Sequence, residues 1–356
     1  MLTANTNAKQ TIRDVRYDLL RICAALMVVV IHVSASNWYC VPYDSMEWAV
    51  MNGYDSFARS AVPIFFMLSG AFVLKKEIGI KSLWLKKILP LLIIYLVWSF
   101  LYAVDTIGIA QLTSTSGMDW VCLIVESKYH LWFLPALLGI YIIQPVLYAI
   151  VQCKEGKYIP YMIVIFIVFG IVKSTVGAFL GSYELLDSVL GILPVELVGY
   201  CGYVILGYYL SNINPIRMRP VFALVGYVIT AFLATLIGQG YAFYMEDRSG
   251  VLYGYFTLPV FIEAIFLFLF FQNFNCKRDD SDRVKSCISR VATLTLGIYL
   301  LHPYFIDKLY SMGMHTLTIH PMIAIPVISV GIFVISMIIS WVMSKIPVVK
   351  RCWTLS

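Results

Sequence analysis

Long apolar stretches separated by short polar segments follow one another along the whole chain. A helix needs about 20 mostly apolar residues to cross ~30 Å of hydrocarbon, and ten stretches meet that requirement. They lie near residues 17–37, 57–75, 88–108, 131–151, 159–179, 188–210, 220–240, 251–272, 291–311 and 322–344. No soluble domain or long linker interrupts them. The pattern predicts an all-α polytopic bundle of about ten transmembrane helices, with residues 1–356 forming one membrane-embedded domain.

The composition supports a membrane protein. Hydrophobic residue types make up 60% of the chain and charged types 13%, which is about half the charged share of an ordinary globular protein. No basic segment with interleaved aromatic residues stands outside the apolar stretches, so nucleic-acid binding is not expected. The eight cysteines show no spacing typical of a metal site, and we predict no bound metal.

The distribution of lysine and arginine predicts the orientation of the bundle. If the N-terminus is cytoplasmic, that side receives all 26 of these residues except Arg59, Lys128, Lys173, Arg248 and Lys308. Such a bias is typical of cytoplasmic loops, and it places both termini in the cytoplasm. Residues 109–130 then form the longest outer segment. It is polar, and two interpretations are open: part of an acceptor site, or a solvated loop.

The first apolar stretch contains two ionisable residues that are expensive to place in a membrane, Arg21 and His32. Eleven residues correspond to three helical turns and ~16 Å, so both side chains can line one channel. The imidazole of His32 can take and return a proton near neutral pH. Structural interpretations remain open: Arg21 can pair with Asp18, and His32 can be hydrogen-bonded within a helix interface.

A basic cluster precedes the third stretch and contains Lys81, Lys86 and Lys87. On the cytoplasmic side such a cluster can bind anionic lipid or the phosphates of a nucleotide-containing ligand, and composition does not separate the two. Further polar or aromatic residues within or beside the apolar stretches are candidates for lining a pocket: Asp18, Arg59, Ser69, His130, Trp132, Glu263 and His302.

Five segments together resemble the acyltransferase-3 family of integral-membrane O-acyltransferases, in its form that consists of the membrane domain alone. They are residues 17–21 (YDLLR) followed by His32, residues 63–70 (PIFFMLSG), the basic loop that ends at Pro90, residues 130–134 (HLWFL) and residues 298–302 (IYLLH). Each is weak alone, but their order within a ten-span frame is specific.

The resemblance implies an enzyme that moves an acyl group, often acetyl, from cytoplasmic acyl-CoA to a hydroxyl of an extracytoplasmic glycan or lipid-linked glycan. It implies a cell-membrane location, the inner or plasma membrane of a bacterium, with membrane lipids around the bundle. It assigns the essential catalytic role to His32 and donor binding to Arg21. The family usually has arginines in the basic loop, whereas this chain has Lys81, Lys86 and Lys87, which bind phosphate as point charges.

A second functional class is a transporter or flippase for a sugar, a lipid or an acyl-modified solute. Transporters often contain inverted repeats with interrupted helices around a mid-membrane site, and no corresponding halves are found in this sequence. The oligomeric state does not follow from the sequence.

Overall fold

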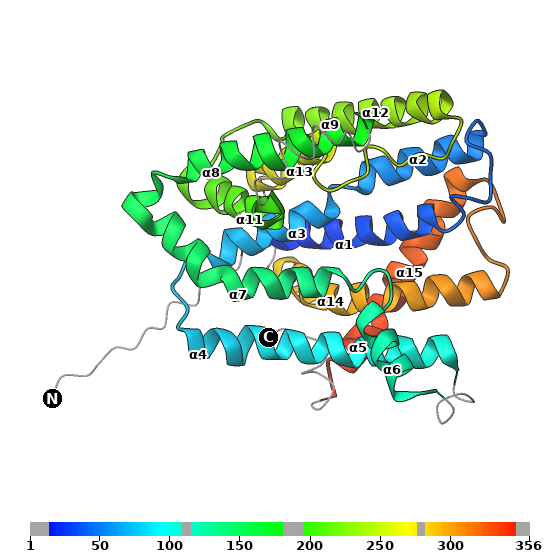
Figure 1. The fold of residues 1–356 in the computed structure, drawn as a ribbon, viewed down its shortest axis with the longest axis horizontal. Helices are drawn as coiled ribbons and strands as arrows, with labels where there is room; N and C mark the ends of the chain where they lie inside the picture. The colour runs from blue at the N-terminus through cyan, green and yellow to red at the C-terminus, as the bar shows by residue number, and fades with distance from the viewer. Residues whose placement is uncertain (1–13, 109–114, 181–194, 276–281, 347–356) are drawn as a thin grey trace.

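The computed structural model describes residues 14–108, 115–180, 195–275 and 282–346, and within these ranges it contains helices and no strand. Most of the helices run side by side in one bundle (Figure 1). The longer helices and their one-turn extensions are α1 (Val15–Ala35), α2 (Met46–Ala58), α3 (Ala61–Val73), α4 (Ile80–Leu83), η1 (Trp84–Ile88), α5 (Leu89–Ile107), α6 (Gly117–Glu126), α7 (Phe133–Gln152), η3 (Cys153–Gly156), α8 (Ile159–Ile165), η4 (Phe166–Val172), α9 (Lys173–Leu180), α11 (Val195–Tyr208), η5 (Tyr209–Ile213), α12 (Pro220–Met245), α13 (Leu258–Asn273), α14 (Asp282–Ser311) and α15 (Pro321–Met343).

The predicted all-α polytopic bundle is confirmed. Within the described ranges, eight helices are long and apolar enough to cross a membrane. The other two predicted spans coincide with α11 and η5, and with the 16-residue helix α13. The count of ten and the placement of the termini stay predictions.

Several helices extend beyond the predicted apolar stretches. The second begins at Met46 rather than near residue 57, the third at Ile80 rather than near 88, and α14 at Asp282 rather than near 291. A further short helix, α6, lies within the segment expected to connect the third and fourth spans. Polar residues continue a helix beyond the hydrocarbon as long as their backbone hydrogen bonds are satisfied, so the apolar length underestimates the helix.

Helix α1 lies inside the bundle and carries two of the predicted site residues. It packs against α2, α3, α13, α14 and α15, and in Figure 1 it runs between the α2–α3 layer and α14. The N-cap Asp14 accepts a hydrogen bond from the Arg16 amide, which satisfies one of the free amides at the helix start. Because α1 is surrounded by other helices, its polar residues face protein rather than lipid.

The second membrane helix is broken between α2 and α3, at Arg59 and Ser60. Pro63 explains the position of the break, because a proline has no amide hydrogen and its ring collides with the carbonyl four residues earlier, here that of Arg59. Pro63 therefore accounts for the interruption between α2 and α3. Arg59, at this interruption, forms an ion pair with Asp55 one helical turn earlier.

Helices α3 and α11 pack at very short distance through two glycines. A Cβ atom added to Gly70 would lie 1.8 Å from the Val204 carbonyl oxygen, and one added to Gly207 would lie 2.0 Å from the Met67 carbonyl oxygen. Small residues are what allow two membrane helices to approach this closely. This contact fixes the position of α3, which forms one wall of the cavity described next.

Candidate active site

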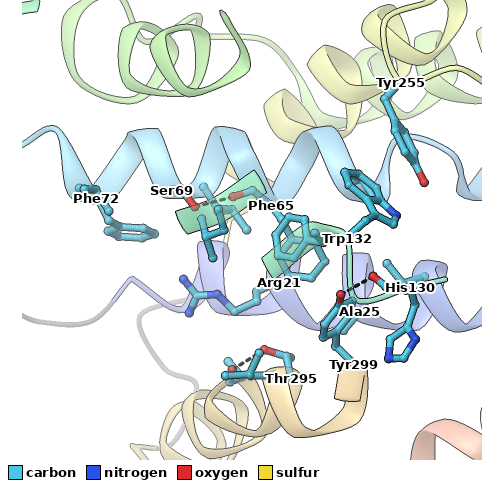
Figure 2. A pocket seen from close by; sticks show the side chains of 18 of the residues that line it. Arg21, Ala25, Phe65, Ser69, Phe72, His130, Trp132, Tyr255, Thr295 and Tyr299 are labelled. Atoms are coloured by element: carbon cyan, nitrogen blue, oxygen red, sulfur yellow. Dashed lines mark hydrogen bonds between the residues drawn. The ribbon is translucent and has the colours of Figure 1, made fainter. Parts of the chain in front are cut away.

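A cavity of about 470 Å³ lies between α1, α3, α7 and α14. Its middle is mostly apolar, whereas charged and polar side chains gather at its two ends. Figure 2 shows Arg21, Phe72 and Ser69 toward one end, and His130, Trp132 and Tyr255 toward the other. The apolar wall between them includes Val28, Phe65, Leu68, Phe133 and Leu137. The cavity therefore joins two chemically different sites.

Arg21 lines the first end, and its predicted pairing with Asp18 is also present. The two side chains are 3.5 Å apart, and the other carboxylate oxygen of Asp18 accepts a hydrogen bond from the Ser289 hydroxyl at 2.7 Å. The guanidinium also lies over the Phe72 ring, 5.8 Å from its centroid. Asp18 is buried beside the cavity and holds Arg21 in place. The ion pair thus orients a cation that lines the cavity.

The structure divides the predicted basic cluster. Lys87 lines the same end of the cavity as Arg21, whereas Lys81 and Lys86 are exposed and do not line it. Lys86 and Lys87 belong to the π-helical turn η1, in which the Leu89 amide donates to the Trp84 carbonyl five residues earlier. Pro90, which lacks an amide hydrogen, follows at once and disrupts the α-helical ladder there. Consecutive residues point to different sides of a helix, so only one of these two neighbouring lysines lines the cavity.

Three histidines meet at the opposite end. The ring centroids of His32 and His302 are 5.1 Å apart and nearly stacked, and those of His130 and His302 are 5.4 Å apart. His32 and His130 line the cavity, and His302 lies behind them, fully buried. Their sequence positions are far apart, so the fold brings together three imidazoles that the sequence only suggests one by one.

Hydrogen bonding fixes the chemical state of His302. Its Nδ1 lies 2.7 Å from the Tyr299 carbonyl oxygen, which can only accept, so Nδ1 carries the hydrogen and Nε2 has a free lone pair. This Nε2 and both ring nitrogens of His130 have no hydrogen-bond partner among the described residues. Buried polar atoms are usually satisfied, so unpartnered imidazoles beside a cavity indicate a place for a polar ligand.

His130 lies in the connection between α6 and α7, just before the helix. The Tyr299 hydroxyl donates to its backbone carbonyl at 2.5 Å and ties this connection to α14. Burial lowers the pKa of His130 well below its usual range, and the nearby His302, His32 and Lys128 act in the same direction. His130 is therefore neutral near pH 7 and carries one hydrogen donor and one acceptor.

Two of the other candidates also line the cavity. The Ser69 hydroxyl donates to the Phe65 carbonyl at 2.9 Å. Trp132 stacks on Tyr200 and on Tyr255, with ring centroids 5.7 and 5.5 Å apart. It therefore belongs to an aromatic wall within the protein and does not sit in a lipid-facing belt.

Arg59 and Glu263 do not line the cavity. Arg59 forms an ion pair with the fully buried Asp55, at 2.6 Å. Glu263 is fully buried, and its carboxyl oxygens have no hydrogen-bond partner in the described part of the chain. In the same ranges, no group of three or more His, Cys, Asp or Glu residues is arranged to hold a metal ion.

Sequence reasoning did not identify Tyr255 and Tyr299, which both line the cavity. The chain contains 24 tyrosines, and neither of these two stands in a pattern that separates it from the rest. The only local signal is that Tyr299 lies within residues 298–302, three positions before His302.

A comparison with protein families matches nearly the whole chain. A family model described as an acyltransferase domain, that of acyltransferase-3, matches residues 14–345. No curated protein and no solved structure matches the chain. The matched range includes both ends of the cavity and all the candidate residues.

Proposed function

This chain belongs to the acyltransferase-3 family, and from that premise we propose that it is a membrane O-acyltransferase that uses acyl-CoA. The proposed acceptor is a hydroxyl of an extracytoplasmic glycan or lipid-linked glycan, and the proposed acyl group is acetyl. The protein would act in a bacterial inner or plasma membrane, with residues 1–356 as one domain.

One observation carries the proposal: a single cavity joins the cationic residues Arg21 and Lys87 to the histidines His32 and His130. Arg21 and His32 are separated by ~16 Å along α1. A transport pathway would not require fixed cations at one end and a general base at the other. An acyl transfer from a long polyanionic donor requires both.

The donor is expected to bind with its phosphates at the end that Arg21 and Lys87 line. A cationic rim retains phosphates, whereas the apolar middle of the cavity accepts an uncharged arm. The positive-inside bias places this end at the cytoplasm, where acyl-CoA is made available. The thioester at the tip of the arm would then reach the histidines at the other end.

At that end His32 is the proposed general base. It takes the proton from the acceptor hydroxyl while the oxygen attacks the thioester carbonyl carbon. The C–S bond then breaks, and the same proton is returned to the leaving thiolate, which gives an ester and free coenzyme A. His302 lies against His32 and is proposed to position its ring.

The test is acyl transfer by the purified protein in lipid nanodiscs, with labelled acetyl-CoA and glycan acceptors of the host envelope. A positioned general base contributes about 10²–10⁴ in rate, so His32→Ala should lower kcat by at least about a hundredfold. His32→Gln retains hydrogen-bonding capacity but accepts no proton, and it should fail equally. Donor binding should persist in both variants, because the phosphates bind at the other end.

Two outcomes would contradict the proposal. One is a His32→Gln protein that keeps most of its activity. The other is a wild-type protein that transfers no acyl group from acyl-CoA but moves the unmodified acceptor across the membrane, as the transporter interpretation requires.

A further inference from the structure

Acyl transfer from a thioester needs a hydrogen-bond donor in addition to a base. When the hydroxyl attacks, the carbonyl oxygen becomes negatively charged, and a preorganised donor at that oxygen stabilises the transition state. His32 is occupied by the proton of the attacking hydroxyl. Another hydrogen-bond donor is therefore needed at the histidine end of the cavity.

Tyr255 presents a hydroxyl at this end. The residue lies in the short connection between α12 and α13, and its side chain lines the cavity. Figure 2 shows the phenol pointing toward the region of Trp132 and His130, at the end away from Arg21. Its ring is half-buried, so the hydroxyl reaches the cavity without being fully exposed to solvent.

The protein holds Tyr255 rigidly. The Tyr203 hydroxyl donates to the Tyr255 backbone carbonyl at 2.5 Å. Two residues later, the Thr257 hydroxyl makes 2.8 Å hydrogen bonds to the carbonyls of Leu252 and Gly254, which close the turn. Trp132 stacks on the Tyr255 ring. Because contacts hold both the backbone and the ring of Tyr255, its hydroxyl can donate a hydrogen bond without rearrangement when charge develops on the carbonyl oxygen.

Arg59 supplies the second observation. Its guanidinium lies 5.0 Å from the centroid of the Tyr253 ring, two residues before Tyr255. Asp55 holds it through two contacts of 2.6 and 3.0 Å. The end of α2 thus places a cation beside the segment that carries Tyr255. A cation in this position favours negative charge on a group that accepts a hydrogen bond from the phenol.

From this geometry we infer that the Tyr255 hydroxyl is a catalytic donor to the thioester carbonyl oxygen, and that the Asp55–Arg59 pair is a positioning element behind it. The inference rests on the proposed function. As the acceptor C–O bond forms, the carbonyl electron pair moves onto oxygen, where the Tyr255 hydroxyl donates to it. When the C–S bond breaks, that pair re-forms the carbonyl. Tyr255 keeps its proton throughout.

The closing experiment compares Tyr255→Phe with Tyr253→Phe in the acetyl-transfer assay. Tyr255→Phe removes one oxygen atom and keeps the stacked ring, and removal of one such donor lowers kcat by about 10²–10³. The KM for acetyl-CoA should change by less than about twofold, because the cationic end is intact. Tyr253 is the matched control: it is two residues away and packs on the same guanidinium, but it does not line the cavity, and Tyr253→Phe should keep wild-type kcat.

The role of Arg59 is tested in a double-mutant cycle. Asp55→Asn with Arg59→Gln removes the charges together and leaves no unpaired carboxylate in the interior. The kcat of this double variant should be at least tenfold below that of the wild type. Adding Tyr255→Phe to it should lower kcat by much less than Tyr255→Phe does in the wild type, because the effects of substitutions at coupled residues are not additive. If the double variant does not insert, Arg59→Lys is used as a separate test, because it keeps the cation but loses its bidentate contact with Asp55. Its kcat should fall while its unfolding temperature stays near that of the wild type, and an unchanged kcat would refute the positioning role of Arg59.

The outcomes separate this inference from the proposed function. A wild-type protein that transfers no acyl group refutes the function. An active wild type with a fully active Tyr255→Phe refutes only the role of Tyr255. If Tyr255→Phe is fully active and His130→Gln loses a hundredfold in kcat, the hydrogen-bond donor to the thioester carbonyl oxygen is His130 instead.

Discussion

The end of the cavity that we propose binds the acyl donor allows a sharp prediction, because only one of the lysines in the basic cluster lines it. Lys87 lines the cavity beside Arg21, and Lys86, the preceding residue, is exposed outside it. We therefore expect Lys87→Gln and Arg21→Gln to weaken binding of acyl-CoA, and Lys86→Gln and Lys81→Gln to leave it nearly unchanged. The last two are matched controls, since each removes the same charge from the same loop.

The magnitude follows from the exposure of these groups. Two unit charges 4 Å apart interact by about 4 kcal/mol at an effective dielectric constant of 20. This interaction energy must be reduced here for two reasons. Arg21 is already paired with Asp18, and its side chain is 28% exposed. Lys87 is also partly exposed to water. About 1–2 kcal/mol remains for each, which is roughly five- to thirtyfold in affinity. Fully solvated lysines contribute less than about 1 kcal/mol.

The assay is the KM and Kd for acetyl-CoA in nanodiscs of uncharged lipid, at low and high salt. The losses should be larger at low salt, because salt screens exposed charges, and kcat should change little. Acetyl-pantetheine, which lacks the nucleotide phosphates, provides a second control: Arg21→Gln and Lys87→Gln should use it as well as the wild type does. Equal effects of Lys86→Gln and Lys87→Gln, or no effect of Arg21→Gln, would refute this assignment and favour a lipid-binding role for the cluster.

Two further predictions concern topology and packing. In whole cells an impermeant thiol reagent should label the exposed Cys40 and Cys122 but not the exposed Cys153 and Cys287, and the reverse pattern would overturn the orientation. Gly70→Ala should lower the unfolding temperature and reduce the folded yield, because its methyl group would lie 1.8 Å from the Val204 carbonyl oxygen. Gly139→Ala is the control: no atom lies within 4 Å of the added carbon, so its unfolding temperature should not change. A Gly70→Ala protein as stable as the wild type would refute the close α3–α11 contact.

The sequence predicts the fold well because the membrane imposes a simple rule. A spanning segment must satisfy its own backbone hydrogen bonds in hydrocarbon, so long apolar stretches become helices. What the rule does not give is where each helix ends. α2 begins at Met46 and α14 at Asp282, since polar turns outside the hydrocarbon prolong a helix without changing its apolar length. The break between α2 and α3 was predictable from Pro63.

The site could be predicted only where polar residues stand in apolar surroundings. Arg21 and His32 are conspicuous for that reason, and both line the cavity. Which of Lys86 and Lys87 faces the cavity depends on how η1 packs against α7, and a residue pattern does not show this. Tyr255 is an ordinary residue in the sequence, and only tertiary packing brings it near Arg59 and Trp132.

Under the proposed function, the separation of Arg21 from His32 along α1 would let one cavity bring an acyl group from a donor on one side of the membrane to an acceptor on the other. A phosphate group in hydrocarbon is costly, as any ion is, whereas an uncharged arm and a thioester are not. Among the described residues, the cations that line the cavity are Arg21 and Lys87, at one end. Under the proposed function they would retain the charged part of the donor there, while its neutral part would extend to the histidines. The apolar wall also limits water, the competing nucleophile, at the thioester. It follows that substitutions at Arg21 and Lys87 should change KM, those at His32 and Tyr255 should change kcat, and the two sets should combine additively.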